Sequence, residues 1–420
     1  MGFQSGLSGL NASAKNLDVI GNNVANSNTV GFKSSRAVFA DVFASSLAGA
    51  GASNIGIGTK VSSVLQEFTQ GNITVTSNPL DLAINGRGFL RLDNNGAVAY
   101  SRNGQLHLDE QGYIVNGDNL RLTGYPVDAT GNIVASAPMP LQLSTSDIAP
   151  HATGSMQATL NLDSRAPVID PLVTPFDPTI ATSYTSSTAG AIYDSLGNAH
   201  TLTMYFSKTN TTGQWQVHTT VDGGPVTDVD LDGAAGPLAA GAPATINFNN
   251  SGVLTTPMPL AGIEVTLPNG AVTPLKMELD YTGTTQYGSE FGVTALSQDG
   301  YTSGRLTGFN VSEKGIIQGR YSNGQANTLG QIVLANFANP QGLKSTGNNL
   351  WEETSSSGPA VVGTPLTGSL GSIQSAAIED SNVDLSQELV NMIMAQRVYQ
   401  ANAQTIKTQD AVLQTLVNLR

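Results

Sequence analysis

The chain has 420 residues, a formal net charge of −13, no cysteine and 46 glycines, and charged residues make up only 12% of it. The acidic balance argues against nucleic acid or an anionic membrane as a partner, and the lack of cysteine excludes disulfides and thiol nucleophiles. Weak charge with many turn-forming residues indicates several β-rich domains rather than an α/β enzyme. No run of eighteen apolar residues is present, so we expect no membrane insertion.

Residues 1–24 are predicted to form the first amphipathic helix. Its apolar positions step by four and three residues, which is the spacing of a coiled-coil seam. These positions are Phe3, Leu7, Leu10, Ala14, Leu17, Gly21 and Val24. Such a seam predicts pairing, either with a helix at the other end of the chain or with neighbouring copies. An ordinary helical hairpin that closes one domain is the simpler alternative.

Residues 34–70 are rich in Ala, Ser and Gly, a composition that is typical of a flexible linker. Val61, Val64 and Phe68 favour a strand within it. We expect an extended segment that becomes ordered on neighbouring subunits.

Recurrent turn signals after residue 71 predict short antiparallel strands. The dipeptide Asn-Gly supplies the positive φ angles of tight hairpin turns, and it occurs at 95–96, 103–104 and 116–117. Short apolar runs lie between the turns, at 89–92, 105–108 and 113–115. The same pattern of short apolar runs between turn residues returns after residue 285.

Residues 147–285 interrupt this pattern and are predicted to form an inserted all-β domain. Twelve acidic residues in this range face only three basic ones, Arg165, Lys208 and Lys276. Its strand candidates are 202–206, 215–220, 263–267 and 276–281.

Residues 381–420 contain no proline or glycine and are predicted to form one long helix, about 60 Å at 1.5 Å per residue. Ser381 with Asp384 favours a capping box at its start. A second seam with steps of four and three contains Leu385, Leu389, Met392, Tyr399, Ala403, Ile406, Leu413 and Val417, with Gln396 and Asp410 at the two remaining places. We expect the two terminal helices to form a coiled-coil stem whose seams drive polymerisation.

No catalytic pattern is present. The four histidines, His107, His151, His200 and His218, lack the spacing of metal ligands. Residues 228–233 begin like a calcium loop, but Ala239 stands where that pattern needs glutamate, so a polar turn is the preferred interpretation. We expect no catalytic residue, no cofactor and no bound metal.

Four motifs resemble those of bacterial flagellar rod and hook proteins. They are LDVIGNNVANSNTVGFK at 17–33, NPLDLAINGRGF at 78–89, LGQIVLANFANPQGL at 329–343 and SNVDLSQELVNMIMAQRVYQANAQTIKTQD at 381–410. Leu90 stands where the family more often has a second phenylalanine, which is an apolar exchange. The resemblance covers about 1–146 and 286–420 and is weakest in the insert.

The resemblance implies an α+β, multidomain chain in which long terminal α-helices form a coiled-coil stem and mainly antiparallel β domains are nested between them. Four parts are expected: a terminal coiled-coil domain (1–24 plus 381–420), an extended connector (25–70 plus 362–380), an inner β domain (71–146 plus 286–361) and an inserted outer β domain (147–285).

The resemblance also implies a structural role, in the self-assembling curved tube of the hook that transmits torque from motor and rod to filament. A distal rod subunit is the alternative within the family, and the large insert argues against it. A surface adhesin or carbohydrate-active domain on a polymerising stalk is the alternative from another class.

The implied partners are further copies of the chain, the hook cap, the distal rod, the hook–filament junction proteins and the flagellar type III export apparatus. The implied location is extracellular. We expect it to be reached without a cleaved signal peptide, because no basic region followed by an apolar core begins the chain.

Overall fold

The computed structural model describes residues 2–42, 58–128, 131–144, 146–224, 228–229, 243–265, 267 and 269–418. The chain divides into two compact units. Unit 1 comprises Met1–Thr145, Gly308–Arg320 and Ala326–Arg420, and unit 2 comprises Ser146–Thr307 and Tyr321–Gln325. Across the described residues, no helix combines the length and the apolar character needed to cross a membrane.

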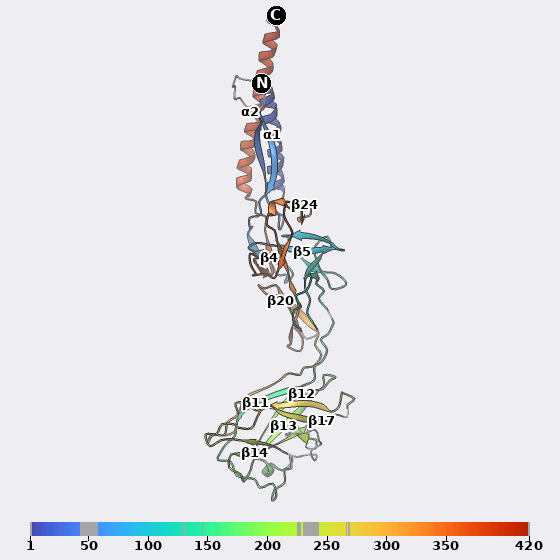
Figure 1. The fold of residues 1–420 in the computed structure, drawn as a ribbon, viewed down its shortest axis with the longest axis vertical. Coiled ribbons are helices and arrows are strands. Elements are labelled where there is room, and N and C mark those ends of the chain that lie inside the picture. The colour runs from blue at the N-terminus through green and yellow to red at the C-terminus, as the bar shows by residue number, and fades with distance from the viewer. Residues whose placement is uncertain are drawn as a thin grey trace. The chain divides into compact units, whose positions relative to one another are not determined.

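Two helices at the ends of the chain lie side by side in unit 1 (Figure 1). They are α1 (Gly2–Ala25) and α2 (Leu385–Asn418). Both helices were expected, but α2 begins four residues later than predicted. Asp384 is its N-cap, because its Oδ1 accepts the backbone N–H groups of Ser386 and Gln387 at 2.9 and 3.1 Å. Ser381 lies before the helix, so the predicted capping box is wrong.

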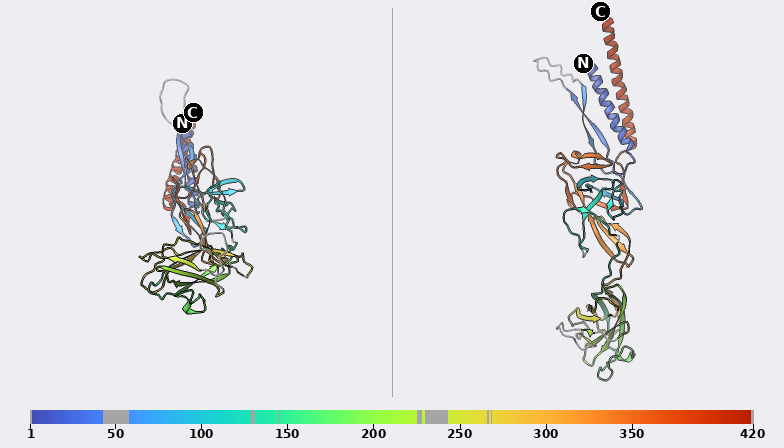
Figure 2. Two further views of the ribbon diagram at one scale, coloured as in Figure 1. Left: turned by 60° about the horizontal axis from the view of Figure 1, so that its bottom comes forward. Right: turned by 90° about the vertical axis from the view of Figure 1, so that its right-hand side faces the viewer.

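The segment expected to order on neighbouring subunits instead folds against the chain's own first helix. Strands β1 (Ser35–Val42) and β2 (Gly58–Gln66) form an antiparallel hairpin along α1 (Figure 2). Residues 43–57, which join the two strands, lie outside the described residues. The Asn23 side chain fixes the start of the hairpin, because its amide exchanges two hydrogen bonds with the Ser35 backbone at 2.8 and 2.9 Å.

The β part of unit 1 combines strands from both sides of the insert. The strands before it are β3 (Ile73–Val75), β4 (Leu82–Asn85), β5 (Phe89–Asn94), β6 (Ala97–Ser101), β7 (His107–Leu108), β8 (Ile114–Val115), β9 (Arg121–Tyr125) and β10 (Met139–Pro140). Those after it are β20 (Leu306–Val311), β21 (Ile316–Tyr321), β22 (Ala326–Ile332), β23 (Leu334–Asn336), β24 (Lys344–Gly347), β25 (Leu350–Glu352), β26 (Val361–Gly363), β27 (Ser372–Ser375) and β28 (Ala377–Glu379), with a 3₁₀ turn at Pro340–Gly342.

Antiparallel pairs join the outgoing and returning halves of the chain. β3 pairs with β28, β4 with β27, β5 with β23, β6 with β25 and β9 with β22. The nested antiparallel β architecture with two terminal helices is therefore confirmed. An aromatic cluster of Phe89, Tyr100, Phe337 and Trp351 packs edge to face inside it.

Two Asn-Gly pairs differ in what they do. Asn95 and Gly96, at φ 50° and 99°, form the tight turn between β5 and β6 that the sequence predicted. Asn103-Gly104 is not such a turn. Gly104 is needed for close approach, because a Cβ there would lie 1.8 Å from the Leu82 carbonyl oxygen.

Unit 2 consists of two sheets with one shared core. One sheet has the order β15 (Asp228–Val229), β17 (Leu260–Val265), β18 (Leu275–Asp280), β11 (Ser155–Asn161) and β19 (Gly292–Gln298). The other has β12 (Ser186–Tyr193), β13 (Ala199–Lys208), β14 (Gln214–Val221) and β16 (Ala244–Asn247), and a 3₁₀ turn lies at Ala181–Ser183. The four predicted strand runs coincide with or overlap β13, β14, β17 and β18. The pair β11–β18 is parallel.

The boundary of unit 2 differs from the one expected at residue 285. β19 pairs along β11 from Met156 to Asn161, and the Leu162 N–H bonds the Thr285 carbonyl at 2.8 Å. β19, which lies in the part that we assigned to the inner domain, therefore completes a sheet of unit 2, and this stretch of unit 2 extends to Thr307. Turn composition alone did not separate the last strand of the insert from the first strand that follows it.

Candidate assembly interface at the helical end

The contact between α1 and α2 includes two glycines and several polar side chains. A Cβ added at Gly6 would lie 3.1 Å from Cγ1 of Ile406, and one added at Gly9 would lie 2.8 Å from the Asn402 side chain. Asn402 Nδ2 also donates to Ser13 Oγ at 3.4 Å. Glycine lets the two backbones approach closely here, because any larger residue would meet the partner helix.

Many of the larger apolar residues of the predicted seams point away from this contact. Leu389 is 45% exposed and Leu413 is 52% exposed. Phe3, Leu7, Leu385 and Tyr399 are also exposed, whereas Leu10, Leu17, Val24, Met392 and Ile406 are partly buried. The side chain of Val417 lies outside what the structure describes. Within one chain, a large part of the apolar surface of the seams therefore remains exposed to solvent.

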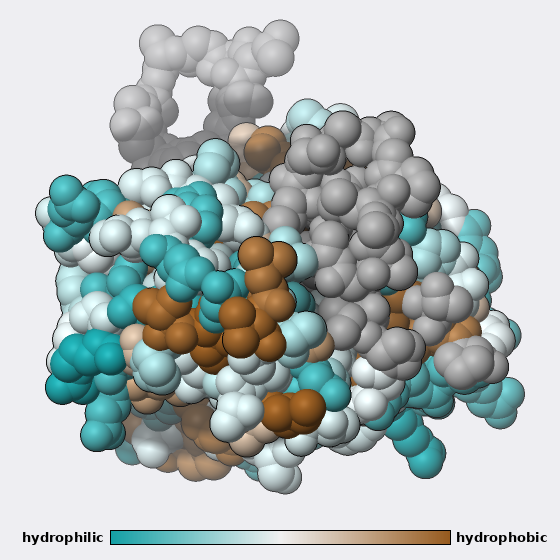
Figure 3. Space-filling model, turned by 90° about the horizontal axis from the view of Figure 1, so that it is seen from below, coloured by the Kyte–Doolittle hydropathy of each residue, from teal (hydrophilic) through white to brown (hydrophobic). Residues whose placement is uncertain are grey.

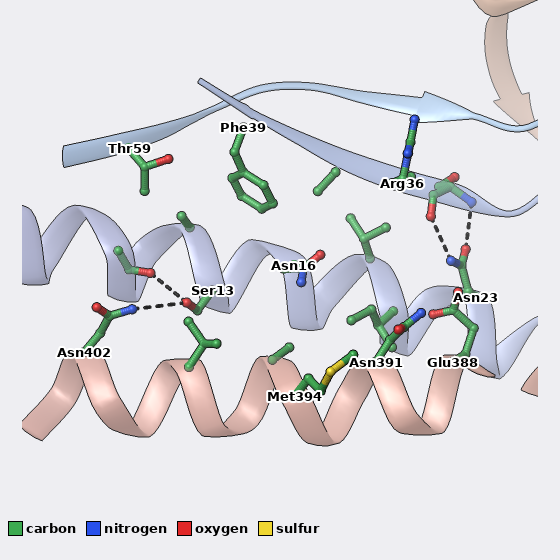
Figure 4. Close-up of a pocket in the computed structure, with 18 of the residues that line it drawn as sticks. Ser13, Asn16, Asn23, Arg36, Phe39, Thr59, Glu388, Asn391, Met394 and Asn402 are labelled. Carbon is green, nitrogen blue, oxygen red and sulfur yellow. Dashed lines mark hydrogen bonds between the residues drawn. The ribbon is translucent and has the colours of Figure 1, made fainter. Parts of the chain in front are cut away.

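A groove of about 790 Å³ runs along α1, between α2 on one side and the β1–β2 hairpin on the other (Figure 4). Its floor is formed by α1, where Gly9, Ala12 and Ser13 are small and Asn16, Val19 and Ile20 are larger. Its walls present larger apolar side chains: Phe39 from the hairpin, and Met394 and Val398 from α2.

Among the described residues that line the groove, the charged ones are Arg36, Glu67 and Glu388. Arg36 and Glu388 lie toward the end near Asn23 (Figure 4). Arg36 Nε lies 3.4 Å from Glu67 Oε1. Burial raises the pKa of Glu388, the nearby charge of Glu67 raises it further, and hydrogen bonds from Asn23 and Asn391 oppose the rise. The other described residues that line the groove are uncharged.

We call α1, α2 and the β1–β2 hairpin the helical end of unit 1. A buried ionic cluster lies where the helical end meets the other β strands of unit 1. Glu379 accepts from Lys33 Nζ at 2.6 Å and from an Arg102 guanidinium nitrogen at 3.1 Å, and all three residues are at most 4% exposed. Lys33 also donates to the Thr69 carbonyl at 2.7 Å, and the Gly71 N–H donates to Glu379 at 3.0 Å. Burial lowers the pKa of Lys33 and of Arg102, against the opposing charge of Glu379.

Sequence reasoning missed this ionic cluster. Its members are far apart in the chain, and Lys33 and Glu379 are separated by 346 positions. The sequence offered one signal for such a cluster, which is a charged residue inside an otherwise apolar run. Glu379 in the β28 sequence Ala-Ile-Glu is an example. Pairing three such residues needs the fold itself.

The described part of the chain contains no group of three or more His, Asp or Glu side chains that could hold a metal ion. The calcium-like residues 230–233 lie outside the described residues. His200 lies between Asp222 Oδ2, at 2.7 Å from its Nδ1, and Asp194 Oδ2, at 3.4 Å from its Nε2. His218 is buried and stacks on Phe176 at 4.0 Å. These contacts join loops and strands of unit 2.

Four family models match successive parts of the chain. They are "Flagella basal body rod protein" at 3–33, "Flagellar hook protein FlgE/F/G D1 domain" at 83–163, "Flagellar basal body protein FlaE D2 domain" at 161–301 and "Flagellar basal body rod FlgEFG protein C-terminal" at 374–419. Together with the paired terminal helices and the nested β strands, these matches define the class: the chain is a structural protein of the flagellar rod and hook.

The relatives define the family within this class. The chain is 45% identical to the flagellar hook protein FlgE of Escherichia coli and 44% identical to that of Salmonella typhimurium, with 100% of each chain covered. It is 32% identical to the FlgE of Treponema pallidum over 99% of this chain and 98% of that one. The chain belongs to the flagellar hook protein FlgE family.

A solved structure shares the fold at low sequence identity. The Helicobacter pylori flagellar hook protein FlgE2 matches with a TM-score of 0.52 at 14% identity, over 72% of this chain and 99% of that one.

Proposed function

We propose that this structural subunit of the bacterial flagellar hook assembles through its helical end, with the exposed seams of α1 and α2 buried between copies as a coiled-coil stem. The exposure of Leu389 and Leu413 carries this proposal. Burying each larger apolar side chain contributes roughly 1.5–3 kcal/mol. A few such residues from each helix supply enough free energy to hold a polymer together.

The ionic cluster of Lys33, Arg102 and Glu379 supports a role in transmitting torque. It links the root of the helical end to the β strands by charged hydrogen bonds that are shielded from solvent. A load applied to the helices therefore passes into the β strands through a connection that resists bending. This is the mechanical property that a rotating tube requires at the junction of its inner and outer parts.

The organisation we propose has a coiled-coil domain of residues 1–24 and 381–420, followed by the connector, an inner β domain and an outer β domain. The pairing of β19 with β11 supports assigning residues 286–307 to the outer domain. The partners we propose are further copies, the hook cap, the distal rod and the hook–filament junction proteins. We also propose export by the flagellar type III apparatus to the cell exterior, and no catalytic activity.

Substitution of the seam tests the assembly proposal. Leu389→Asp and Leu413→Asp place a carboxylate where a neighbouring copy would cover it, which costs its solvation without a new partner. We expect both variants to remain folded by circular dichroism and to form no tubes by electron microscopy. Gln404→Asp, on an exposed position of α2 outside the seam, is the matched control and should polymerise. Tubes formed by both seam variants at the concentration that the unmodified chain requires would overturn the proposal.

A further inference from the structure

The groove beside α1 leaves apolar side chains of both its walls in contact with solvent. Phe39 and Met394 are exposed on its two walls, and Val398 is 52% exposed. These side chains flank a cavity of about 790 Å³ above α1, which leaves room for another element between them (Figure 4). Exposed apolar surface arranged in this way is typical of an interaction site.

Charge restricts what can enter the groove. Most of the net charge of −13 lies in residues 147–285, so it does not keep a second copy away from the helical end. Among the described residues that line the groove, only Arg36, Glu67 and Glu388 are charged. A charge placed against the other lining residues would lose solvation without gaining a partner. An occupant from a second copy should therefore also be uncharged where it lies along the groove.

The free end of α2 has this property. Gly6 of α1 lies against Ile406, and α1 begins at Gly2, so α2 continues past α1 for its last eight residues, 411–418 (Figure 2). These residues contain no charged side chain, and Val412 and Leu413 are about half exposed.

The lengths also agree. At 1.5 Å per residue, the free end measures about 12 Å, and the groove, which follows α2 from Glu388 to Asn402, measures about 21 Å. The free end therefore fits inside the groove and leaves its charged end uncovered.

We propose that residues 411–418 of one copy lie in the groove of a second copy, between Phe39 of the hairpin and Val398 of α2. Groove and free end lie on different parts of the same chain, so the contact is heterologous and can repeat from copy to copy. A contact of this kind produces an open helical polymer when the rotation between copies does not close a ring. This inference rests on the proposed function. It states that the C-terminal turns of α2 bind the groove of the neighbouring subunit.

Cysteine pairs test this contact in the assembled polymer, because the chain has no cysteine of its own. We would combine Val398→Cys on the groove wall with Val412→Cys on the free end, polymerise the full chain and oxidise it. We expect a ladder of covalent multimers on a non-reducing gel. The control pair combines Val412→Cys with Asp18→Cys, an exposed position of α1 that does not line the groove, and should give at least tenfold less product.

The outcomes separate the two proposals. If tubes form but the groove pair gives no more product than the control pair or Val412→Cys alone, the groove contact is wrong and the assembly role stands. If the cysteine-free chain forms no tubes, both proposals fail.

A second substitution covers the case in which the double variant does not assemble. Asn16→Trp fills the floor of the groove and should raise the concentration needed for assembly at least tenfold, whereas Asp18→Trp should not. Equal effects of the two tryptophans would overturn the groove contact.

Discussion

Unit 2 and the helical end place their large apolar residues in opposite ways. In unit 2, Phe206, Trp215 and Tyr281 are at most 1% exposed, in a core that two sheets share. At the helical end, Gly6 and Gly9 make the internal contact, and Leu389 and Leu413 remain in solvent. Unit 2 therefore contains the partners that its apolar surface needs. The helical end lacks them, which is the arrangement expected of a part that is completed by other copies.

Both regions expose some apolar side chains, so they differ in how many they expose and where these lie. Unit 2 also exposes apolar side chains, among them Leu172 at 92% and Val173, and one apolar area on this unit is visible in Figure 3. These residues lie in the loop before β12 and not in the sheets. Exposed apolar residues of a loop add to a surface without altering the core beneath, whereas exposed residues make up most of the larger apolar side chains described in α2.

The largest expected effect is at the ionic cluster that joins the helical end to the strands of unit 1. Glu379→Gln leaves the buried charges of Lys33 and Arg102 without an anion, so unit 1 should lose about 3–5 kcal/mol of unfolding free energy. Glu352→Gln, in an exposed pair with Lys344, should cost at most about 1 kcal/mol. Urea unfolding of the two variants gives both values. Similar losses would show that the cluster does not hold the helical end in place.

A matched pair of leucines tests the comparison itself. Leu202 of β13 is fully buried, and Leu202→Ala should destabilise unit 2 by about 2–5 kcal/mol. Leu389→Ala should change the stability of the dilute monomer by no more than about 0.5 kcal/mol, because it removes little buried contact. Chemical unfolding at low protein concentration measures both. A large loss for Leu389→Ala in the monomer would mean that the helical end has a core of its own.

Unit 2 should lose stability toward acid through His218. Burial lowers the pKa of this residue to about 4, below the value of about 6.5 in an unfolded chain. The unfolded state therefore binds the proton first, and stability should fall by about 1–3 kcal/mol as the pH drops from 6.5 toward 4. His218→Phe, which keeps an aromatic ring on Phe176, should flatten this part of the unfolding profile. An unchanged acid slope in the variant would exclude His218 as its source.

His200 should act in the opposite direction and with the smallest effect. Burial lowers its pKa, but hydrogen bonds and charges from Asp222 and Asp194 outweigh burial and raise it. The raised pKa means that its stabilisation is complete below about pH 6.5 and is lost as the pH rises through the folded-state value. His200→Gln should remove this alkaline loss, and His107→Gln, at an exposed position of unit 1, should not. Thermal unfolding between pH 6 and 9 compares the variants.

Local patterns accounted for much of the fold. The four-and-three spacing predicted α1 and α2. Apolar runs between turn residues predicted β5, β13, β14, β17 and β18, but not long strands such as β1, β11, β12 and β19. Long-range contacts were not accessible in this way. The hairpin against α1 depends on Asn23 reaching Ser35, and the true end of unit 2 depends on β19 finding β11. At the candidate interface, the seam residues were visible in the sequence, whereas the groove appears only when α1, α2 and the hairpin lie together.

The contact between Lys33 and Glu379 has a consequence for the order of folding. It closes a loop of 346 positions, and the entropy cost of closing so long a loop is about 5 kcal/mol. Such a contact forms late, after local strands and hairpins have shortened the effective loop. Glu379 is also synthesised long after Lys33 and Arg102, so a growing chain carries these two cations without their anion. The helical end should therefore be the last part of a newly made chain to become fixed.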